Sequence, residues 1–87
     1  MKPTNQKQQV IYYLYNYESI TMKFVINDSM FWKFNTRLSE MEKKHGTFTN
    51  KKTIKFTNRF GRKSDFKMYS KCVSDEKLKE IYSIYSD

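Results

Sequence analysis

The sequence predicts a single α+β domain in which three helices precede a two-stranded β-hairpin and a fourth helix follows it. Apolar residues recur with helical spacing up to residue 45, alternate with polar residues from 47 to 73, and return to helical spacing over 75–86. A chain of this length buries only about 60–65% of the surface that its unfolded form exposes, which suits one small core. We therefore expect one domain over residues 1–87, divided into a helical part (4–45), a hairpin (47–73) and a C-terminal helix (75–86).

The first predicted helix is rich in tyrosine. Thr4 or Asn5 can cap its start, because a side-chain oxygen there accepts a hydrogen bond from a free backbone N–H of the first turn. Its apolar stripe consists of Val10, Ile11, Leu14 and Tyr17. The tyrosines outside this stripe are expected to pack against the C-terminal segment or a partner. Residues 20–21, which follow, are too few for more than a strand stub.

The third predicted helix has the most distinctive exposed face. A short second helix (22–27) and a turn (27–29) lead to it, and Asp28 or Ser29 in that turn can cap it. It is expected over about 30–44, with Gly46 ending it. Its core stripe consists of Phe31, Phe34, Leu38 and Met41. The opposite face carries Trp32, Thr36, Ser39 and Lys43, with Lys33 to one side and Arg37 at the edge of the core stripe.

Two of these side chains have competing interpretations. Trp32 is either an exposed contact for a partner or a residue packed on a neighbouring loop. Arg37 either reaches a partner or lies over the apolar stripe and pairs with Glu40, Glu42 or Asp28, and we favour the second interpretation. The same helix therefore carries candidates for recognition and candidates for folding.

From residue 47 onward the pattern is that of a β-hairpin. One side is expected to be apolar and to carry Phe48, Ile54, Phe56, Phe66, Met68 and Cys72. Residues 58–63 form the turn, where Gly61 can adopt the positive φ that a tight hairpin requires. The result is a two-stranded ribbon with a basic tip and one basic face.

The C-terminal helix is amphipathic. Ser74 can cap it, and Asp75 and Glu76 lie favourably in its first turn, where the helix dipole attracts negative charge. Its apolar stripe consists of Leu78, Ile81, Tyr82 and Tyr85. This helix either closes the core against the first helix or forms a homodimer contact through residues 75–86.

Basic residues are concentrated in the predicted hairpin. The chain has 17 Lys and Arg against 9 Asp and Glu, a net charge of +8. Residues 51–71 hold eight basic residues and one acidic residue, which is +7 of that total. Such a stretch is either a solvated face or a surface that contacts phosphates, and we favour the second interpretation.

The predicted order of elements is that of a winged helix-turn-helix domain. In that fold the third helix enters the major groove of DNA, and the hairpin, or wing, follows the backbone or reaches the neighbouring minor groove. The basic stretch 51–71 coincides with the predicted wing. Fold and charge therefore point to the same partner.

A set of short motifs spread over residues 7–70 supports this interpretation. They are Ser19-Ile20-Thr21, Asn27-Asp28, Lys33-Phe34, Arg37-Leu38-Ser39, Met41, Gly46, Asn58-Arg59-Phe60-Gly61-Arg62 and Tyr69. Together they resemble the small helix-turn-helix domain proteins of bacteriophages and integrated mobile elements. The resemblance implies the winged-helix fold more firmly than any activity.

The chain departs from the pattern of that family at two positions. Met30 stands where the family usually has a small residue, often glycine, before the third helix. Lys33 stands where the family prefers arginine. The first departure implies that the turn geometry or the start of the third helix is shifted.

The composition argues against an enzyme. No pair of carboxylates, no nucleophile–histidine couple and no glycine-rich phosphate loop is present in the sequence, and one His and one Cys cannot build a metal cluster. We therefore expect no catalytic residue, no metal and no cofactor. No apolar run approaches the roughly 18 residues of a membrane span. A soluble protein without a leader, in the cytoplasm or nucleoid of a bacterial host, is expected.

Double-stranded DNA is the predicted partner, and the function is expected to be regulatory. The candidate DNA-binding residues are Trp32, Lys33, Thr36, Arg37, Ser39 and Lys43 on the third helix, Arg59, Arg62 and Lys63 at the wing tip, and Lys51, Lys55 and Lys67 along the wing. Contact with five to seven phosphates predicts a log–log salt slope of about −4.5 to −6.

Two alternatives remain open from the sequence. In the first, the domain binds a host or phage protein, such as a polymerase, nuclease or defence enzyme, through Trp32, the tyrosines of the first helix and the last helix. In the second, aromatic rings on the hairpin stack on RNA bases. The second is weaker, because most of those rings are expected to be needed for the core.

Overall fold

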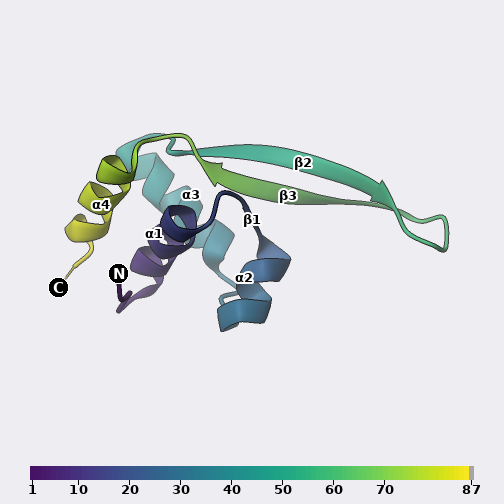
Figure 1. Ribbon diagram of the computed structural model, residues 1–87, viewed down its shortest axis with the longest axis horizontal. Helices are drawn as coiled ribbons and strands as arrows, with labels where there is room; N and C mark the ends of the chain where they lie inside the picture. Colours follow the sequence, from purple (N-terminus) through teal and green to yellow (C-terminus); the bar gives the residue numbers. More distant parts are fainter. Residues whose placement is uncertain (87) are drawn as a thin grey trace.

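The computed structural model describes residues 1–86 and has four helices and three strands (Figure 1). In chain order they are α1 (Gln6–Asn16), β1 (Ile20–Thr21), α2 (Met22–Ser29), α3 (Phe34–His45), β2 (Thr49–Thr57), β3 (Lys63–Lys71) and α4 (Asp75–Ile84). The α+β class and the four helices match the prediction. The order of elements differs from the expected one, because a strand stands between α1 and α2.

The sheet is antiparallel, with the strand order β1-β3-β2. The prediction of a two-stranded ribbon was incomplete: the segment expected to be only a stub forms a third strand, in which Ile20 lies opposite Tyr69 and Thr21 opposite Met68. Both Ile20 and Tyr69 are buried. Burial of this pair explains how two residues suffice, since so short a strand adds little hydrogen bonding of its own.

The molecule has two regions of different character, a helical body and a projecting arm (Figure 1). Its principal extents are 48 × 23 × 21 Å. The arm, defined here as residues 52–67, is the outer part of the β2–β3 hairpin and its turn. No residue of the arm is buried. The body, which comprises the helices and the base of the sheet, contains the whole core.

The core lies between the four helices and the base of the sheet. Its buried apolar members are Val10, Ile11, Tyr13, Leu14, Ile20, Val25, Phe31, Phe34, Leu38, Met41, Phe48, Tyr69, Leu78 and Ile81. Edge-to-face ring contacts organise its centre, with the Phe34 centroid 6.3 Å from that of Tyr13 and 5.7 Å from that of Tyr69. Leu78 and Ile81 are buried and α4 packs on α1, so within one chain the last helix closes the core.

The predicted helix ends at Asn5, Ser74 and Gly46 are confirmed. The Asn5 side chain accepts a hydrogen bond from the backbone N–H of Gln8, and the Ser74 hydroxyl accepts one from the N–H of Lys77. Gly46 ends α3 with a φ of 82°. These short-range features depend only on neighbouring residues, which explains why the sequence sufficed to find them.

The predicted start of the third helix was wrong. α2 continues through Ser29, and Met30 then adopts the left-handed conformation, so α3 begins at Phe34 and not at residue 30. Asp28 and Ser29 do not cap α3. Their side chains hydrogen-bond the Tyr13 hydroxyl, at 2.6 and 2.7 Å, which holds the end of α2 against α1.

Ile54, Phe56, Phe66 and Met68 share one face of the hairpin, as predicted, but the expectation that most of the hairpin rings join the core was wrong. The face of the sheet that packs on α3 carries Tyr69, whereas Phe56, Phe66 and Cys72 are exposed. The strands project past the helices, so an alternating pattern there no longer indicates which side is buried.

Candidate nucleic-acid interface

The tip of the arm is a turn held together by one asparagine. Asn58 Oδ1 accepts hydrogen bonds from the backbone N–H groups of Phe60 (2.9 Å) and Arg62 (3.1 Å), and the Asn58 N–H donates to the Arg62 carbonyl (2.9 Å). Gly61 supplies the predicted positive φ, 78°, and its N–H donates to the Asn58 carbonyl (3.0 Å). The turn therefore fixes the backbone from which Arg59, Phe60 and Arg62 project into solvent.

The two strands give the arm two different faces. Residues paired across antiparallel strands share a face, so the pairs Thr53–Lys67, Lys55–Asp65 and Thr57–Lys63 form a basic face. The pairs Ile54–Phe66, Phe56–Ser64 and Lys52–Met68 form the other face, which is largely apolar. Nearest the body, the basic face continues into Lys51 and Tyr69, the residues that contact α3.

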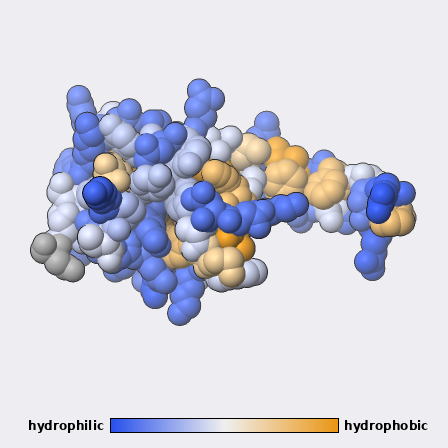
Figure 2. Space-filling view, turned by 60° about the horizontal axis from the view of Figure 1, so that its bottom comes forward, coloured by the Kyte–Doolittle hydropathy of each residue, from blue (hydrophilic) through white to orange (hydrophobic). Residues whose placement is uncertain are grey.

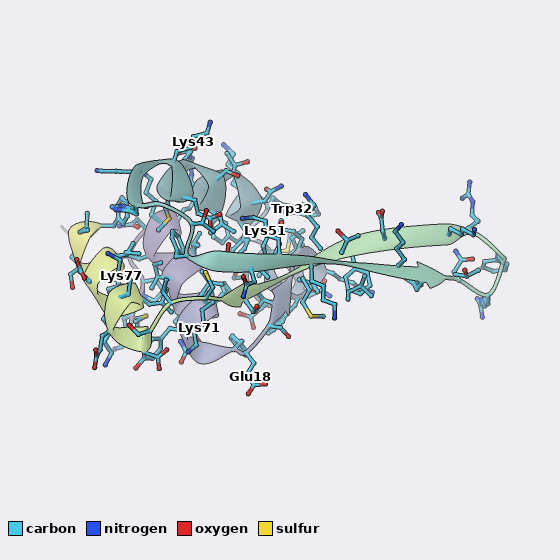
Figure 3. All side chains as sticks on the ribbon, turned by 90° about the horizontal axis from the view of Figure 1, so that it is seen from above. Glu18, Trp32, Lys43, Lys51, Lys71 and Lys77 are labelled. Carbon is cyan, nitrogen blue, oxygen red and sulfur yellow. The ribbon has the colours of Figure 1, made fainter. Side chains whose placement is uncertain are left out.

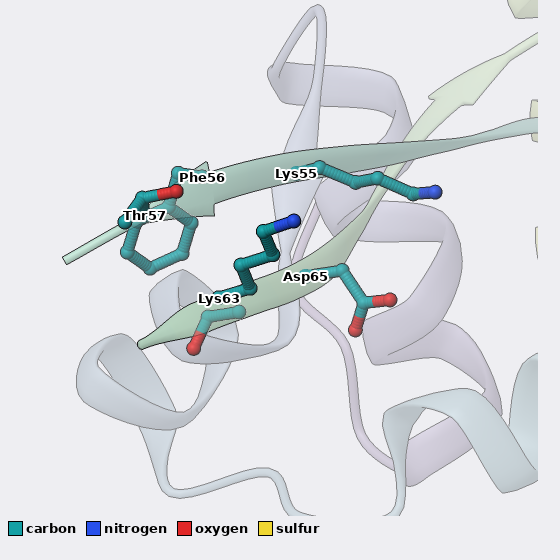
Figure 4. Close-up of a pocket in the computed structure, with 6 residues that line it drawn as sticks. Lys55, Phe56, Thr57, Lys63 and Asp65 are labelled. Atoms are coloured by element: carbon teal, nitrogen blue, oxygen red, sulfur yellow. The ribbon is translucent and has the colours of Figure 1, made fainter. Parts of the chain in front are cut away.

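None of the arm's cations has an acidic partner within residues 1–86. Within residues 1–86, six arm side chains form no ion pair: Lys52, Lys55, Arg59, Arg62, Lys63 and Lys67. The one acidic residue of the arm, Asp65, lies opposite Lys55 but forms no ion pair with it, and Figure 4 shows the two side chains on the same side of the ribbon with their charged ends apart. Six basic residues and one acidic residue give the arm a net charge of +5.

Lys51, a predicted contact at the base of the ribbon, is part of a cluster of bonds within the body. Its ammonium lies 2.6 Å from Glu42 of α3. The same carboxylate accepts hydrogen bonds from the Phe48 N–H (3.0 Å) and the Thr49 hydroxyl (3.1 Å). Burial alone would raise the pKa of Glu42, but the bonds from Lys51, Phe48 and Thr49 outweigh it and hold that pKa below its ordinary value. This cluster joins α3 to the start of β2.

The outward face of α3 carries the predicted polar residues. Thr36, Ser39 and Lys43 are all exposed, on the side of the helix opposite its buried residues. Figure 3 shows Lys43 pointing away from the sheet on the outer side of α3. This face is available to a partner.

Trp32 and Lys33 do not lie on the helix, contrary to the prediction. They form the turn before α3, where Lys33 is the N-cap and provides no side-chain hydrogen bond. Trp32 is 64% exposed, which rules out the alternative in which it packs on a loop. In Figure 3 it lies near the point where the arm leaves the helices. The shift of the helix start moves both side chains from the helix face to its N-terminal end.

Arg37 supports the structural interpretation. Its guanidinium contacts Glu40 at 2.8 Å, and its Nε donates to the Gln6 side chain at 2.9 Å. The bond to Gln6 connects α3 to the start of α1, and the pair with Glu40 lies within α3. Its role in the body is therefore a sufficient explanation of its presence.

An exposed apolar groove runs beside the arm and was missed in the sequence. It encloses about 900 Å³ between the outer part of β3 and the starts of α2 and α3. Phe66, Met68 and Phe56 line it from the arm, with Met22 opposite, and the rings of Phe56 and Phe66 are 5.8 Å apart. Figure 2 shows apolar side chains gathered along the arm and at its base. The sequence shows that these residues alternate with polar ones, but it does not show that they lie too far from the core to be buried.

Two other titratable groups with shifted pKa values, Tyr13 and His45, have structural partners. Burial, with the hydrogen bond to Asp28, raises the pKa of Tyr13 to about 12. Burial and the charges of nearby lysines lower the pKa of His45, whose Nε2 lies 2.7 Å from the Tyr85 hydroxyl. Over residues 1–86 no group of three or more His, Cys, Asp or Glu side chains could hold a metal ion.

Comparison with known proteins adds no relative. No family model, no curated protein and no solved structure matches this chain. Among the helices in residues 1–86, none combines the length and the apolar character needed to cross a membrane.

Proposed function

We propose that this protein binds double-stranded DNA as a winged helix of the phage or mobile-element type, with α3 in the major groove and the arm as the wing. The observation that carries the proposal is the arm. It places six cations without acidic partners on a projecting ribbon that contributes nothing to the core. Phosphates are the ligand that such a ribbon attracts, because each neutralised phosphate releases a condensed counterion.

The dimensions of the arm suit a duplex. Residues 52–57 span about 20 Å at about 3.3 Å per residue. The distance along the axis from a major groove to the adjacent minor groove is half a helical turn, about 17 Å. An arm anchored beside α3 is therefore long enough to bring Arg59 and Arg62 to the neighbouring minor groove.

The parts of the surface have different roles in this proposal. The hydroxyls of Thr36 and Ser39 are suited to base edges, since each can donate and accept a hydrogen bond. Lys43 and Lys33 flank them and reach phosphates. Arg37 and Lys51, which are held by Glu40 and Glu42, orient α3 in the body and are not needed as contacts.

Fluorescence anisotropy with a random duplex of about 25 base pairs, at several salt concentrations, tests the proposal. The key variant is Arg59→Glu/Arg62→Glu, and the matched control is Lys2→Glu/Lys77→Glu. Each lowers the net charge from +8 to +4. Lys77 lies on α4, at the end of the molecule away from the arm (Figure 3).

We expect wild type and control to bind with a log–log salt slope of about −4.5 to −6, and the arm variant to lose binding to every sequence. Thr36→Ala/Ser39→Ala is expected to keep the slope and to change the preference among duplexes selected from a random pool. Equal binding by the two charge-reversed variants would contradict the assignment of this surface, because net charge alone would then explain the affinity.

A second candidate function rests on the apolar groove beside the arm. Its floor of Phe56, Phe66 and Met68 is not used by the core, and Lys23 and Lys67 line it as well. This combination suits an acidic protein segment with apolar side chains, not a nucleic acid backbone. The tyrosines of α1, by contrast, are no longer candidates for the contact set, because Tyr13 is buried and Tyr12 and Tyr15 pack against the core.

The two functions separate by mutation. Binding of an identified acidic host or phage protein at equal stoichiometry, lost in Phe56→Ser/Phe66→Ser but kept in Arg59→Glu/Arg62→Glu, would support the second function. DNA binding, by contrast, is expected to be lost in Arg59→Glu/Arg62→Glu and kept in Phe56→Ser/Phe66→Ser. Loss of both activities in both variants would contradict the division of the arm into two faces.

A further inference from the structure

We propose that Phe60 is a wedge: when the arm reaches the minor groove, its ring inserts between two base pairs and bends the duplex. This inference rests on the proposed DNA-binding function and adds a specific action to it. Proteins that bind the minor groove use apolar side chains in this way, and they bend DNA by about 20–90°.

The exposure of Phe60 is the first observation. Its side chain is 76% exposed, more than any other large apolar side chain of residues 1–86. It belongs to the turn between β2 and β3, which Figure 1 shows at the far end of the arm, away from the core. A polar residue at this position would leave the core unchanged, so packing of the core does not explain the ring.

The second observation is how firmly the ring is presented. The backbone N–H of Phe60 donates to Asn58 Oδ1, and the same oxygen accepts from Arg62 on the other side of the turn. Gly61, with φ of 78°, completes the loop. Insertion needs a wedge whose backbone stays in place, and these bonds order it before DNA is bound.

The third observation is the pair of arginines beside the ring. The Arg59 guanidinium lies 4.9 Å from the centroid of the Phe60 ring, and Arg62 follows two residues later. Arginines next to a wedge can bind the phosphates on both strands at the opened step and so offset the loss of stacking. A tip that bound phosphates only would need the two arginines but not the ring between them.

The other exposed rings of the arm do not fit this role. Phe56 and Phe66 lie on the apolar face, with their centroids 5.8 Å apart, and they line the groove beside the body. They lie along the strands and not at the tip. Phe66 is therefore a matched control for the same substitution.

The test uses a duplex of about 30 base pairs, end-labelled for energy transfer, with 2-aminopurine at a central TA step, because pyrimidine–purine steps unstack most easily. Wild type is expected to shorten the end-to-end distance and raise the 2-aminopurine fluorescence. Phe60→Ala is expected to abolish both signals while keeping the salt slope and lowering affinity about tenfold or less, since the unstacking cost disappears with the insertion. Phe66→Ala should keep both signals, and Phe60→Leu, which retains an apolar wedge, should keep most of the bend.

The outcomes are distinct for the two proposals. Absence of salt-dependent binding by wild type would overturn the DNA-binding function and the wedge with it. Binding with a bend that Phe60→Ala does not reduce would overturn the wedge alone. Because Phe60 contacts no core residue, its truncation leaves the fold intact, and circular dichroism of the variant verifies this.

Discussion

Phenylalanine has opposite surroundings in the two regions of this molecule. In the body, Phe31, Phe34 and Phe48 are buried, whereas in the arm Phe56, Phe60 and Phe66 are between 39% and 76% exposed. All the buried apolar residues within residues 1–86 belong to the body. The aromatic content of the sequence therefore does not measure the core, because half of the six rings named here serve a surface.

Charges differ between the regions in the same way. The ion pairs found in residues 1–86 are Arg37–Glu40, Lys51–Glu42, Lys71–Asp75 and Lys77–Glu80. All of them lie in the body, and the arm has none. A region that neither buries its rings nor pairs its cations is not built for stability, which is the reason to look for its function in binding.

The largest effect on stability is expected when phenylalanine is replaced by alanine in the body, and the same replacement in the arm tests the comparison. Phe34→Ala is expected to lower the free energy of unfolding by about 3–5 kcal/mol, because it empties the centre of the core. Phe60→Ala is expected to change it by less than about 0.5 kcal/mol, because the ring touches no core residue. Urea denaturation followed by circular dichroism measures both.

The expected loss in Phe34→Ala is large compared with the total stability of the domain. A domain of this length has a total stability of roughly 4–13 kcal/mol, so Phe34→Ala removes much of it. Similar losses of unfolding free energy in Phe34→Ala and Phe60→Ala would contradict the distinction between body and arm, because the tip of the arm would then fold as part of the core.

A smaller effect is expected where the two regions join. Glu42→Gln removes the charge that holds Lys51 and weakens the bonds from Phe48 and Thr49. Hydrogen bonds to charged groups contribute about 1.5–3 kcal/mol each, and the Gln side chain keeps part of this, so we expect a loss of about 2 kcal/mol. Asp65→Asn, the same change at the unpaired carboxylate of the arm, is the control and should leave stability unchanged.

The stabilisation by Glu42 depends on pH in a defined direction. Its pKa in the folded protein lies below the ordinary value of 4.5, because the hydrogen bonds it accepts outweigh the effect of burial. The stabilisation is therefore fully present above pH 4.5 and is lost as the pH falls through the lower, folded-state pKa. The difference in unfolding free energy between wild type and Glu42→Gln should shrink in acid. A difference that stays constant to low pH would contradict the cluster as the source of stability.

The sequence predicted the features that depend on near neighbours. The caps at Asn5 and Ser74, the end of α3 at Gly46 and the turn around Gly61 follow from residue types within a few positions. The concentration of charge in residues 51–71 was equally visible. These features established the helices, the hairpin and the basic arm.

Features that depend on distant contacts could not be predicted. β1 exists because Ile20 is buried against Tyr69, almost fifty residues away. The alternation of the hairpin predicted two faces, but not that the arm extends past the helices and leaves Phe56 and Phe66 exposed. The pairing of Lys51 with Glu42, which gives this candidate contact residue a structural partner, could also be seen only in the fold.

The smallest effect on stability is expected at Met30, whose left-handed conformation separates α2 from α3. Met30 has φ of 58°, the only positive value for a non-glycine residue in the part of the chain that the structure describes. The left-handed conformation is unfavourable for such a residue by about 1–2 kcal/mol, and the Met30 side chain is 68% exposed, so little packing offsets it. Met30→Gly removes that strain but adds about 0.5–1 kcal/mol of backbone entropy to the unfolded chain.

The net result in the body should be a gain in unfolding free energy of about 0.5 kcal/mol. The reciprocal change in the arm, Gly61→Ala, places a side chain at φ of 78° with no atom within 4 Å of it, so backbone strain is its only direct effect. Because the tip buries nothing and is separate from the core, this strain should appear as faster hydrogen exchange at the amides of Phe60 and Arg62, without a shift of the urea midpoint. A lower midpoint for Gly61→Ala, or unchanged exchange at those amides, would show that the arm and the body unfold as one unit and that their separation in the folded structure does not extend to their stability.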